Sequence, residues 1–260
     1  MLFVPTPRTI QPGSPVRVAG RWRSRCISAW YANANCDVVR SVRLTLNGTA
    51  GSREGGRISC AGNSLGANYF DIGTISTPAD VTRFSMLAIA TPRTLLSRYS
   101  LFSIEDNGGG GSFSFNEGYN DSSKAFCYNT TSNYTGEIGP SGFFTAGQRA
   151  VYGVSYNKNT NVVVAYKNGV GYSGSFNNAA NINYAMPACP GGRAASGGLV
   201  VQWNGTIELI AIFPYELTAA EFALLSINPW RELFEPLPAL DVGFSVSAGA
   251  VTKTYAQVFG

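Results

Sequence analysis

The sequence reads Ala150-Val-Tyr-Gly-Val-Ser-Tyr156, Asn157-Lys-Asn-Thr-Asn161 and Val162-Val-Val-Ala-Tyr-Lys167 without a break, and Asn168-Gly169 follows. The two apolar segments alternate with period two, which is the period of a β-strand. The Asn-rich segment between them and the Asn-Gly pair are typical of tight turns, because a type I′ turn needs positive φ at both central residues. This stretch therefore predicts antiparallel strands joined by short turns.

The same pattern extends in both directions along the chain. Alternating segments recur at residues 84–90, 99–105, 112–116, 198–203 and 206–213. Further turn signals separate them, namely Asn107 with the glycines at 108–111, and Asn204-Gly205. Many short strands at this spacing predict an all-β sandwich or barrel. Residues 242–259 alternate again, which favours one or two more strands.

One helix is expected at residues 219–226. Thr218-Ala-Ala-Glu221 has the spacing of a capping box, in which the threonine hydroxyl and the glutamate satisfy free N–H groups. Phe222, Leu224 and Leu225 provide an apolar face. Asn228-Pro229 ends the helix, because proline cannot continue it.

Three stretches in this order resemble the concanavalin A-like lectin/glucanase jelly roll in its laminin-G-like version. They are Gly66-Ala-Asn-Tyr-Phe-Asp-Ile-Gly73 with the strand from Phe84, Val162–Gly169, and Trp203–Phe213 with Leu217-Thr-Ala-Ala-Glu221. The resemblance implies an antiparallel jelly-roll β-sandwich over residues 27–226. An extended Pro/Arg-rich arm at 1–26 and an aromatic, proline-rich exit and tail at 227–260 would flank it.

A further stretch points to a source. Asn228-Pro-Trp-Arg-Glu-Leu-Phe-Glu-Pro236 is similar to an ending that follows such jelly rolls in tailed-phage and prophage proteins. The resemblance implies a virion protein, made in the host cytoplasm without a signal peptide. Trp230 and Phe234, flanked by prolines, are expected to pin this exit onto the sandwich.

Composition excludes several classes of function. The chain has no histidine, which rules out a Ser-His-Asp triad, a Cys-His dyad and a His-ligated zinc site. The net charge of +4 is too small to predict nucleic-acid binding, and no apolar run reaches the roughly 18 residues of a membrane span. Five cysteines without a Cys-x-x-Cys spacing are expected to be reduced, buried thiols: Cys26, Cys36, Cys60, Cys127 and Cys189.

The carboxylates give no catalytic pattern. Glucanases of the resembled superfamily carry Glu-x-Asp-x-(x)-Glu on one strand, and this chain lacks that string. Glu105-Asp106 are interpreted as a solvated hairpin end, with cation binding as the alternative. Glu117 and Asp121 lie in a Gly/Asn-rich region that leaves a calcium loop open. Glu208 is expected to face outward from a strand. We therefore expect no enzyme activity and no cofactor.

Aromatic side chains near loops keep sugar binding as a hypothesis. Four tyrosines near loops are candidates for stacking on a sugar ring: Tyr119, Tyr128, Tyr134 and Tyr172. The alternative is that these tyrosines pack on the pleated sheet, as tyrosine commonly does. Trp203 and Trp230 are expected in the core or as clamps.

Residues 1–25 contain five arginines, four prolines and no acidic residue. The sequence predicts an extended arm outside the core that docks on a neighbouring subunit or virion protein, and a passive tail is the alternative. Backbone pairing at a strand edge and arginine–carboxylate pairs would hold it. The expected acidic partners are Glu208, Glu216, Glu221, Glu232 and Glu235. The candidate docking residues are Phe3, Arg8, Arg17, Arg21, Trp22, Arg23 and Arg25.

Together these patterns predict a non-enzymatic structural protein of a tailed-phage virion, with capsid decoration or cementing as its role and a homo-oligomer as its form. The alternative is a carbohydrate-binding receptor module on the phage head or tail, whose ligand is a host surface glycan. A residual glycosidase is a third possibility.

Overall fold

The structure is a computed structural model. It describes residues 16–31, 37–40, 44–47, 51–54, 57–61, 69–74, 80–104, 113–129, 135–176, 182–183, 188–192 and 201–236. Two mainly antiparallel sheets pack face to face in these residues, so the predicted all-β jelly-roll sandwich is confirmed.

The larger sheet has eight strands, and its central strands are long. β8 pairs with β12 on one side and with β18 on the other, and β2 and β5 both pair with β18. In sheet order the strands are β14 (Val170–Ser175), β13 (Val162–Lys167), β12 (Ala150–Asn157), β8 (Arg83–Pro92), β18 (Asn204–Phe213), β5 (Arg57–Ala61) and β4 (Gly51–Glu54), with β2 (Ser28–Tyr31) beside β18.

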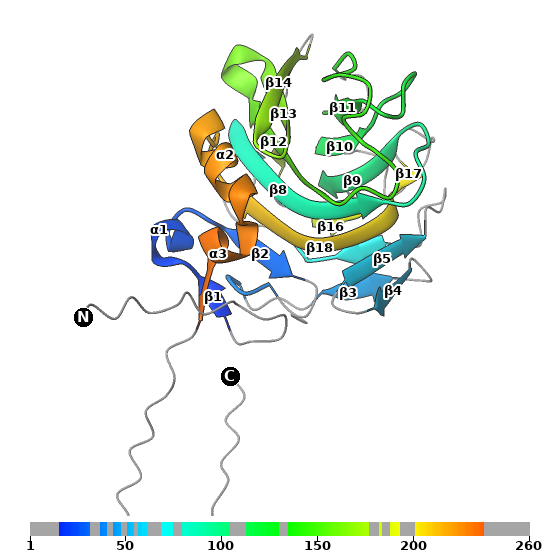
Figure 1. The fold of residues 1–260 in the computed structure, drawn as a ribbon. Helices are drawn as coiled ribbons and strands as arrows, with labels where there is room; N and C mark the ends of the chain where they lie inside the picture. Colours follow the sequence, from blue (N-terminus) through cyan, green and yellow to red (C-terminus); the bar gives the residue numbers. More distant parts are fainter. Residues whose placement is uncertain are drawn as a thin grey trace, which may run out of the picture.

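The smaller sheet has five strands and lies on the concave side of the larger one, whose long strands curve around it (Figure 1). Its members are β11 (Ala125–Tyr128), β10 (Phe113–Glu117), β9 (Tyr99–Ile104), β16 (Ala188–Pro190) and β17 (Val201–Gln202). Only β17 is parallel to its partner among the strand pairs of the described residues.

Besides the two main sheets, the described residues form three two-stranded sheets and four short helices. The pairs are β1 (Val16–Val18) with β19 (Phe234–Pro236), β3 (Thr45–Asn47) with β6 (Tyr69–Asp71), and β7 (Asp80–Val81) with β15 (Ile182–Asn183). The helices are α1 (Gly20–Arg23), α2 (Ala219–Ile227), α3 (Pro229–Leu233) and the 3-10 helix η1 (Lys158–Thr160).

The inner core lies between the two sheets and is rich in aromatic rings. Phe84 of β8 and Phe113 of β10 meet edge-on with centroids 4.7 Å apart, which joins the sheets directly. Burial of each such ring stabilises the fold by roughly 1.5–3 kcal/mol. The largest fully buried side chains include Trp30, Phe70, Phe84, Phe102, Phe113, Phe115, Phe143, Phe144, Tyr152, Tyr156 and Trp203.

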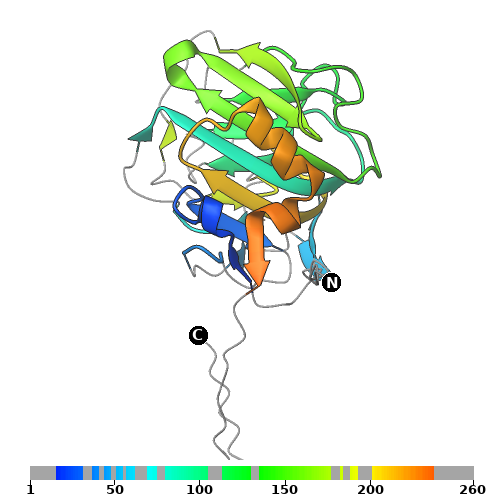
Figure 2. The same ribbon diagram turned by 60° about the vertical axis from the view of Figure 1, so that its left-hand side comes forward.

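The outer core lies on the opposite, convex face of the larger sheet. Leu87, Ile89 and Leu209 point there from the central strands, and α1, α2 and α3 cover them (Figure 2). Phe222 of α2 stacks on Tyr166 of β13 with centroids 3.8 Å apart. Both faces of the central strands are thus buried.

The predicted turns have two outcomes. Asn168 and Gly169 have φ of 49° and 84°, as the type I′ prediction requires, and they join β13 to β14. The turn predicted at Asn204-Gly205 is wrong, because both residues belong to strand β18. Glycine is needed at 205 for another reason: a Cβ there would lie 2.2 Å from the Thr91 carbonyl oxygen.

The predicted helix is confirmed as α2, with the capping box at Thr218 and Glu221 in place. Two more α-helices of the described residues, α1 and α3, were not predicted from the sequence. Pro229 ends α2 but also begins α3, since proline is favoured in the first turn of a helix and the Asn228 side chain caps the Arg231 N–H.

The expectation that residues 1–25 lie outside the core is wrong for the part that the structure describes. Residues 16–18 form β1, and Trp22 in α1 is only 2% exposed because it packs edge-on against Phe213. Arg21 pairs with Glu232, and Arg25 pairs with Glu221 at 2.6 Å. Edge pairing and arginine–glutamate pairs therefore exist as predicted, but within one chain.

The C-terminal exit is pinned to the sandwich as predicted. Phe234 is buried in the outer core, and half-buried Trp230 meets Tyr31 edge-on at 5.7 Å. The strands predicted within 242–259 lie outside the described residues.

The cysteines have the predicted state where they are described. Cys26, Cys60, Cys127 and Cys189 are buried and free, and burial raises the pKa of both Cys26 and Cys60 to about 12. Cys36 lies outside the described residues. In the described part of the chain, no helix has the length and apolar character needed to cross a bilayer.

Candidate functional site

Two loops at one end of the sandwich expose a small aromatic surface. Leu96 and Arg98 lie in the loop after β8, and Tyr119 lies in the loop after β10. Leu96 is 55% exposed and Tyr119 is 48% exposed. The Arg98 guanidinium stands over the Tyr119 ring, 4.0 Å from its centroid, which is a cation–π contact. We call Leu96, Arg98 and Tyr119 the rim platform.

Hydrogen bonds tie the two loops of the rim platform together. The Leu96 N–H donates to Glu117 Oε2 at 2.9 Å, and the Ser97 hydroxyl donates to the Tyr119 carbonyl at 2.8 Å. Arg98 has a positive φ of 69°, which turns the chain into β9. The platform is therefore held in place before any ligand arrives.

The loop that carries Tyr119 is also braced from below. Glu137 Oε1 accepts the N–H groups of Asn120 and Asp121, both at 2.6 Å. Gly118 is required at its position because a Cβ would lie 2.1 Å from the Asp121 carbonyl oxygen. This bracing fixes the direction of the loop beneath the exposed ring.

Glu117 beneath the platform is an unusual carboxyl group. It is fully buried, and its Oε1 atom has no hydrogen-bond partner within the described part of the chain. Burial raises its pKa to about 9, an effect that the Leu96 N–H only partly offsets. Glu117 is therefore protonated and neutral at pH 7.

Calcium binding at Glu117 and Asp121 was an alternative in the sequence analysis, and the described residues show no set of ligands for it. Glu117 is neutral, and Asp121 accepts hydrogen bonds from Ser123 N at 3.0 Å and Ser141 Oγ at 2.7 Å. Within the described ranges, no three Asp, Glu, Cys or His side chains gather as a metal site would require.

The tyrosine candidates separate by exposure. Tyr128 is buried on the outer face of the smaller sheet, and Tyr172 is half-buried with its ring edge-on to Phe143 at 5.9 Å. Tyr134 lies outside the described residues. Of the three described candidates, Tyr119 is the exposed one. Leu96 and Arg98 were missed, because no sequence signal shows that their loop lies beside Tyr119.

A polar row crosses the outer face of the smaller sheet next to the platform. Asn116, Ser100 and Gln202 are register partners on β10, β9 and β17, so their side chains share that face. All three are fully buried. Asn116 Oδ1 and both side-chain polar atoms of Gln202 have no hydrogen-bond partner among the described residues.

The other predicted positions have clear places. Glu208 sits at a β-bulge of β18 and is 8% exposed, because Arg149 and Arg57 pair with it at 2.8 and 3.3 Å. Glu208 is thus a partner in structural ion pairs rather than an ordinary outward-facing residue. Trp203 is a core residue, as predicted. Glu105 and Asp106 lie outside the described residues.

The docking candidates are only partly described. Beyond Arg21, Trp22 and Arg25, the backbones of Arg17 and Arg23 lie in β1 and α1, while Phe3 and Arg8 lie outside the described residues.

Comparison of the sequence with protein-family models and with curated proteins gives no match. Solved structures do match in fold. Domain 4 of an extracellular GH43 arabinanase from Geobacillus stearothermophilus, solved with arabinotriose, has a TM-score of 0.54 at 16% identity. That match covers 78% of this chain and 98% of the arabinanase domain.

Sialidase from Trypanosoma rangeli, solved with sialic acid, gives a TM-score of 0.57 at 14% identity. The match covers 79% of this chain but only 33% of the sialidase, so the chain corresponds to about a third of that enzyme. At these identities the similarity shows a shared β-sandwich fold.

Proposed function

We propose that this chain is a non-catalytic carbohydrate-binding module whose ligand lies on the rim platform. The observation that carries the proposal is the exposed Tyr119 ring, braced between two hydrogen-bonded loops with a guanidinium on it. Aromatic rings stack on the apolar faces of sugars. Since Arg98 covers one face of the Tyr119 ring, a sugar would stack on the opposite face, and the guanidinium N–H groups would donate to its hydroxyls. Structural neighbours solved with arabinotriose and with sialic acid support glycans as the ligand class.

The absence of catalysis is part of the proposal. Glycoside hydrolysis by the usual route needs two carboxyl groups flanking the bond, one of them ionised. At the rim, Glu117 is buried and neutral, while Asp121 and Glu137 are engaged in holding the loop. A bound sugar would therefore be held and released unchanged.

The test is a glycan array followed by calorimetric titration of the best ligand, with arabinotriose and sialic acid included as probes. Tyr119→Ala should weaken binding at least tenfold, which corresponds to about 1.4 kcal/mol, while Tyr119→Phe should retain it. Val170→Ala is the matched control, because Val170 is exposed on β14. Equal affinity of the wild type and Tyr119→Ala, or no glycan bound by the wild type, would overturn the proposal.

A structural place on a tailed-phage virion is the second candidate, with this module as a capsid decoration or cementing protein and a homo-oligomer. The segment at 228–236 favours it, through its similarity to endings in phage proteins. In this proposal residues 27–226 form the jelly roll and residues 227–260 its exit and tail, while the arm predicted at 1–26 is shortened to residues 1–15. Since Arg21 and Arg25 are engaged within the chain, we assign virion docking to residues 1–15.

Co-sedimentation with empty capsids tests this second candidate. Removal of residues 1–15 should abolish decoration. Removal of residues 1–25 is not a clean test, because it also takes Val18 and Trp22 out of the outer core. Equal decoration by the chain lacking residues 1–15 would contradict the docking role.

A further inference from the structure

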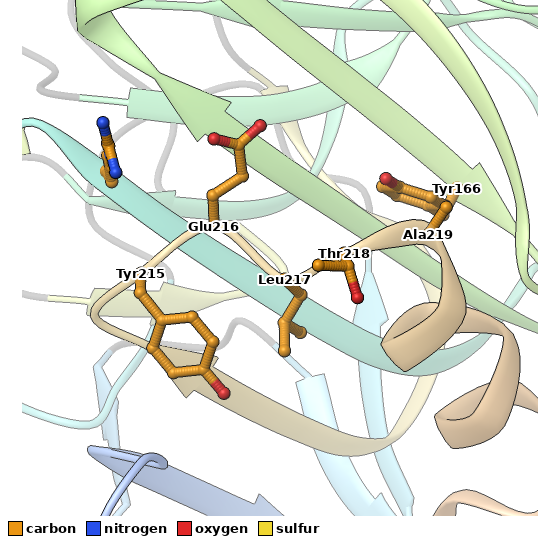
Figure 3. A pocket seen from close by; sticks show the side chains of 7 residues that line it. Tyr166, Tyr215, Glu216, Leu217, Thr218 and Ala219 are labelled. Atoms are coloured by element: carbon orange, nitrogen blue, oxygen red, sulfur yellow. The ribbon is translucent and has the colours of Figure 1, made fainter.

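A pocket lies on the convex side of the molecule, on the outer face of the larger sheet. It has a volume of about 400 Å³ and is lined by Arg83, Tyr166 and residues 215–219 (Figure 3). Arg83 begins the ten-residue strand β8, whereas the rim platform follows the other end of that strand. The pocket is therefore separate from the proposed glycan site, and its volume suits one small molecule.

The walls of this pocket are fixed by the fold. The Leu217 N–H donates to the buried Ser85 hydroxyl at 2.8 Å, and the Leu217 side chain is buried. The capping box then holds Thr218 at the start of α2. Tyr166 is clamped by its stack on Phe222. A ligand would meet a preformed site, which lowers the entropic cost of binding.

The Glu216 carboxylate is oriented into the pocket by one hydrogen bond. Its Oε2 atom accepts from the Asn157 side-chain amide at 2.8 Å, and buried Asn157 is itself fixed because its Oδ1 accepts the Asn159 N–H. Figure 3 shows the carboxylate pointing away from Tyr215, with the Tyr166 hydroxyl on the side that faces it. Burial raises the pKa of Tyr166, and the Glu216 charge raises it as well, which agrees with this placement.

Arg83 brings a positive charge to the same pocket. It is exposed at the pocket wall, and its guanidinium forms no hydrogen bond or ion pair with any other described residue. Elsewhere in the described chain, Arg21, Arg25 and Arg149 are each paired with a glutamate. The pocket thus holds opposite charges that do not neutralise each other, and each keeps its capacity to bind a ligand group.

We propose that this pocket binds a small zwitterion, whose carboxylate pairs with Arg83 and whose ammonium group pairs with Glu216. Arginine recognises carboxylates through its planar fork of donors, and a carboxylate accepts the donors of an ammonium group. The Tyr166 hydroxyl would provide a third contact beside the ammonium site. A free amino acid and an amino sugar acid share this chemistry, and the experiment separates them.

The experiment is a titration of the full chain at pH 7, followed by NMR, with two zwitterions and their blocked analogues. L-leucine is compared with N-acetyl-L-leucine and L-leucinamide, and muramic acid is compared with N-acetylmuramic acid and glucosamine. At least one zwitterion should bind tenfold or more tightly than both of its analogues. The source is whichever of the two series shows that preference.

Charge-removing variants assign the two contacts. With Arg83→Gln, the zwitterion and its analogue without the carboxylate should bind equally. With Glu216→Gln, the zwitterion and its N-acetyl analogue should bind equally, while the Asn157 contact can be kept by the new amide. Arg231→Gln is the matched control, since Arg231 is exposed on α3 away from the pocket lining.

Two results would overturn the proposal. One is that neither zwitterion binds better than its blocked analogues. The other is that a neutral sugar such as methyl arabinofuranoside fills the pocket equally well and is insensitive to both variants. Neither result bears on the rim platform, because glycan binding there is read out by Tyr119→Ala.

Discussion

The inner and outer cores lie on the two faces of the same sheet, yet they are built from different parts of the chain. Strands of alternating sequence close the inner core, where Phe84 meets Phe113. Helices and strands from opposite ends of the sequence close the outer core, where Trp22 and Phe234 belong to one cluster. Period-two alternation in the sequence therefore predicts the strands that enclose the inner core. The elements that cover the outer face of the larger sheet depend on contacts between residues far apart in the sequence, which alternation does not predict.

The two sides also treat carboxylates differently. Glu117 at the edge of the inner core is buried, neutral and left with an unpartnered oxygen. On the outer side, Glu221 and Glu232 are paired with Arg25 and Arg21. Ionisation of Glu117 therefore lowers the stability of the fold. Ionisation of Glu221 and Glu232 raises it, because each carboxylate then pairs with an arginine.

The largest effect is expected from removing an inner-core ring. Phe84→Ala deletes a fully buried side chain whose space cannot collapse between two sheets, so unfolding free energy should fall by about 3–5 kcal/mol. Chemical denaturation measures this loss. Leu96→Ala, at an exposed position, should stay within about 0.5 kcal/mol of the wild type. A loss below 1 kcal/mol for Phe84→Ala would mean that the inner core is not the main stabilising region.

The next effect concerns Glu117 and pH. The folded chain keeps this proton up to about pH 9, whereas the unfolded chain releases it near the usual pKa of 4.5. Stability should therefore fall as pH rises between these values, by about 1.4 kcal/mol per pH unit and so by about 3 kcal/mol from pH 5 to pH 7.

Glu117→Gln mimics the protonated acid and should remove that slope. Denaturation of both proteins at pH 5, 7 and 8.5 measures it. An identical pH dependence in the wild type and the variant would show that Glu117 is solvated in solution.

A smaller effect is expected where the outer core touches the sheet. A Cβ on Gly153 would lie 2.3 Å from the Phe222 ring, so Gly153→Ala should cost about 1–3 kcal/mol by overpacking. The penalty should largely disappear when Phe222 is also changed to Ala, because the clash partner is gone. A double-mutant cycle measures this coupling. Additive losses would mean that α2 is not seated on β12 as described.

The smallest effect is expected from an outer-core ion pair. Burial alone would raise the pKa of Glu221, but hydrogen bonds from Thr218 and Arg25 outweigh it and lower the pKa. Glu221→Gln can keep the capping box and loses only the charge, so the cost at pH 7 should be about 0–1 kcal/mol. A lowered pKa means that Glu221 stabilises the fold only when it is ionised. The stability difference between the wild type and Glu221→Gln should therefore vanish as pH falls below the usual pKa of 4.5. A cost unchanged at pH 3 would contradict the ion-pair contribution.

Local chemistry accounts for what the sequence predicts well. The turn at Asn168-Gly169 and the capping box of α2 depend on residues within four positions of each other, and both are present. The strands of the inner core follow from alternation alone. Asn204-Gly205 looks identical to the true turn, but its glycine serves the close approach of Thr91 instead.

Long-range contacts account for what was missed. Trp22 lies in a basic, proline-rich segment whose composition predicts an extended arm. The burial of the Trp22 ring depends on Phe213, which lies almost two hundred residues later in the sequence. At the rim, Tyr119 was one candidate among four, and its contact with Arg98 joins two loops that are separate in the sequence. Arg83 and Glu216 line the same pocket only because β8 starts beside the loop after β18.

The antiparallel pairing of β1 with β19 has a mechanical consequence. Val16 is opposite Pro236, so tension applied to the chain through these two residues pulls both strands apart from the same end. The load then falls on one backbone hydrogen bond at a time, as in a zipper, instead of being shared along the strands. Under force this ribbon should peel open at low tension and release length before the long strands of the larger sheet bear any load.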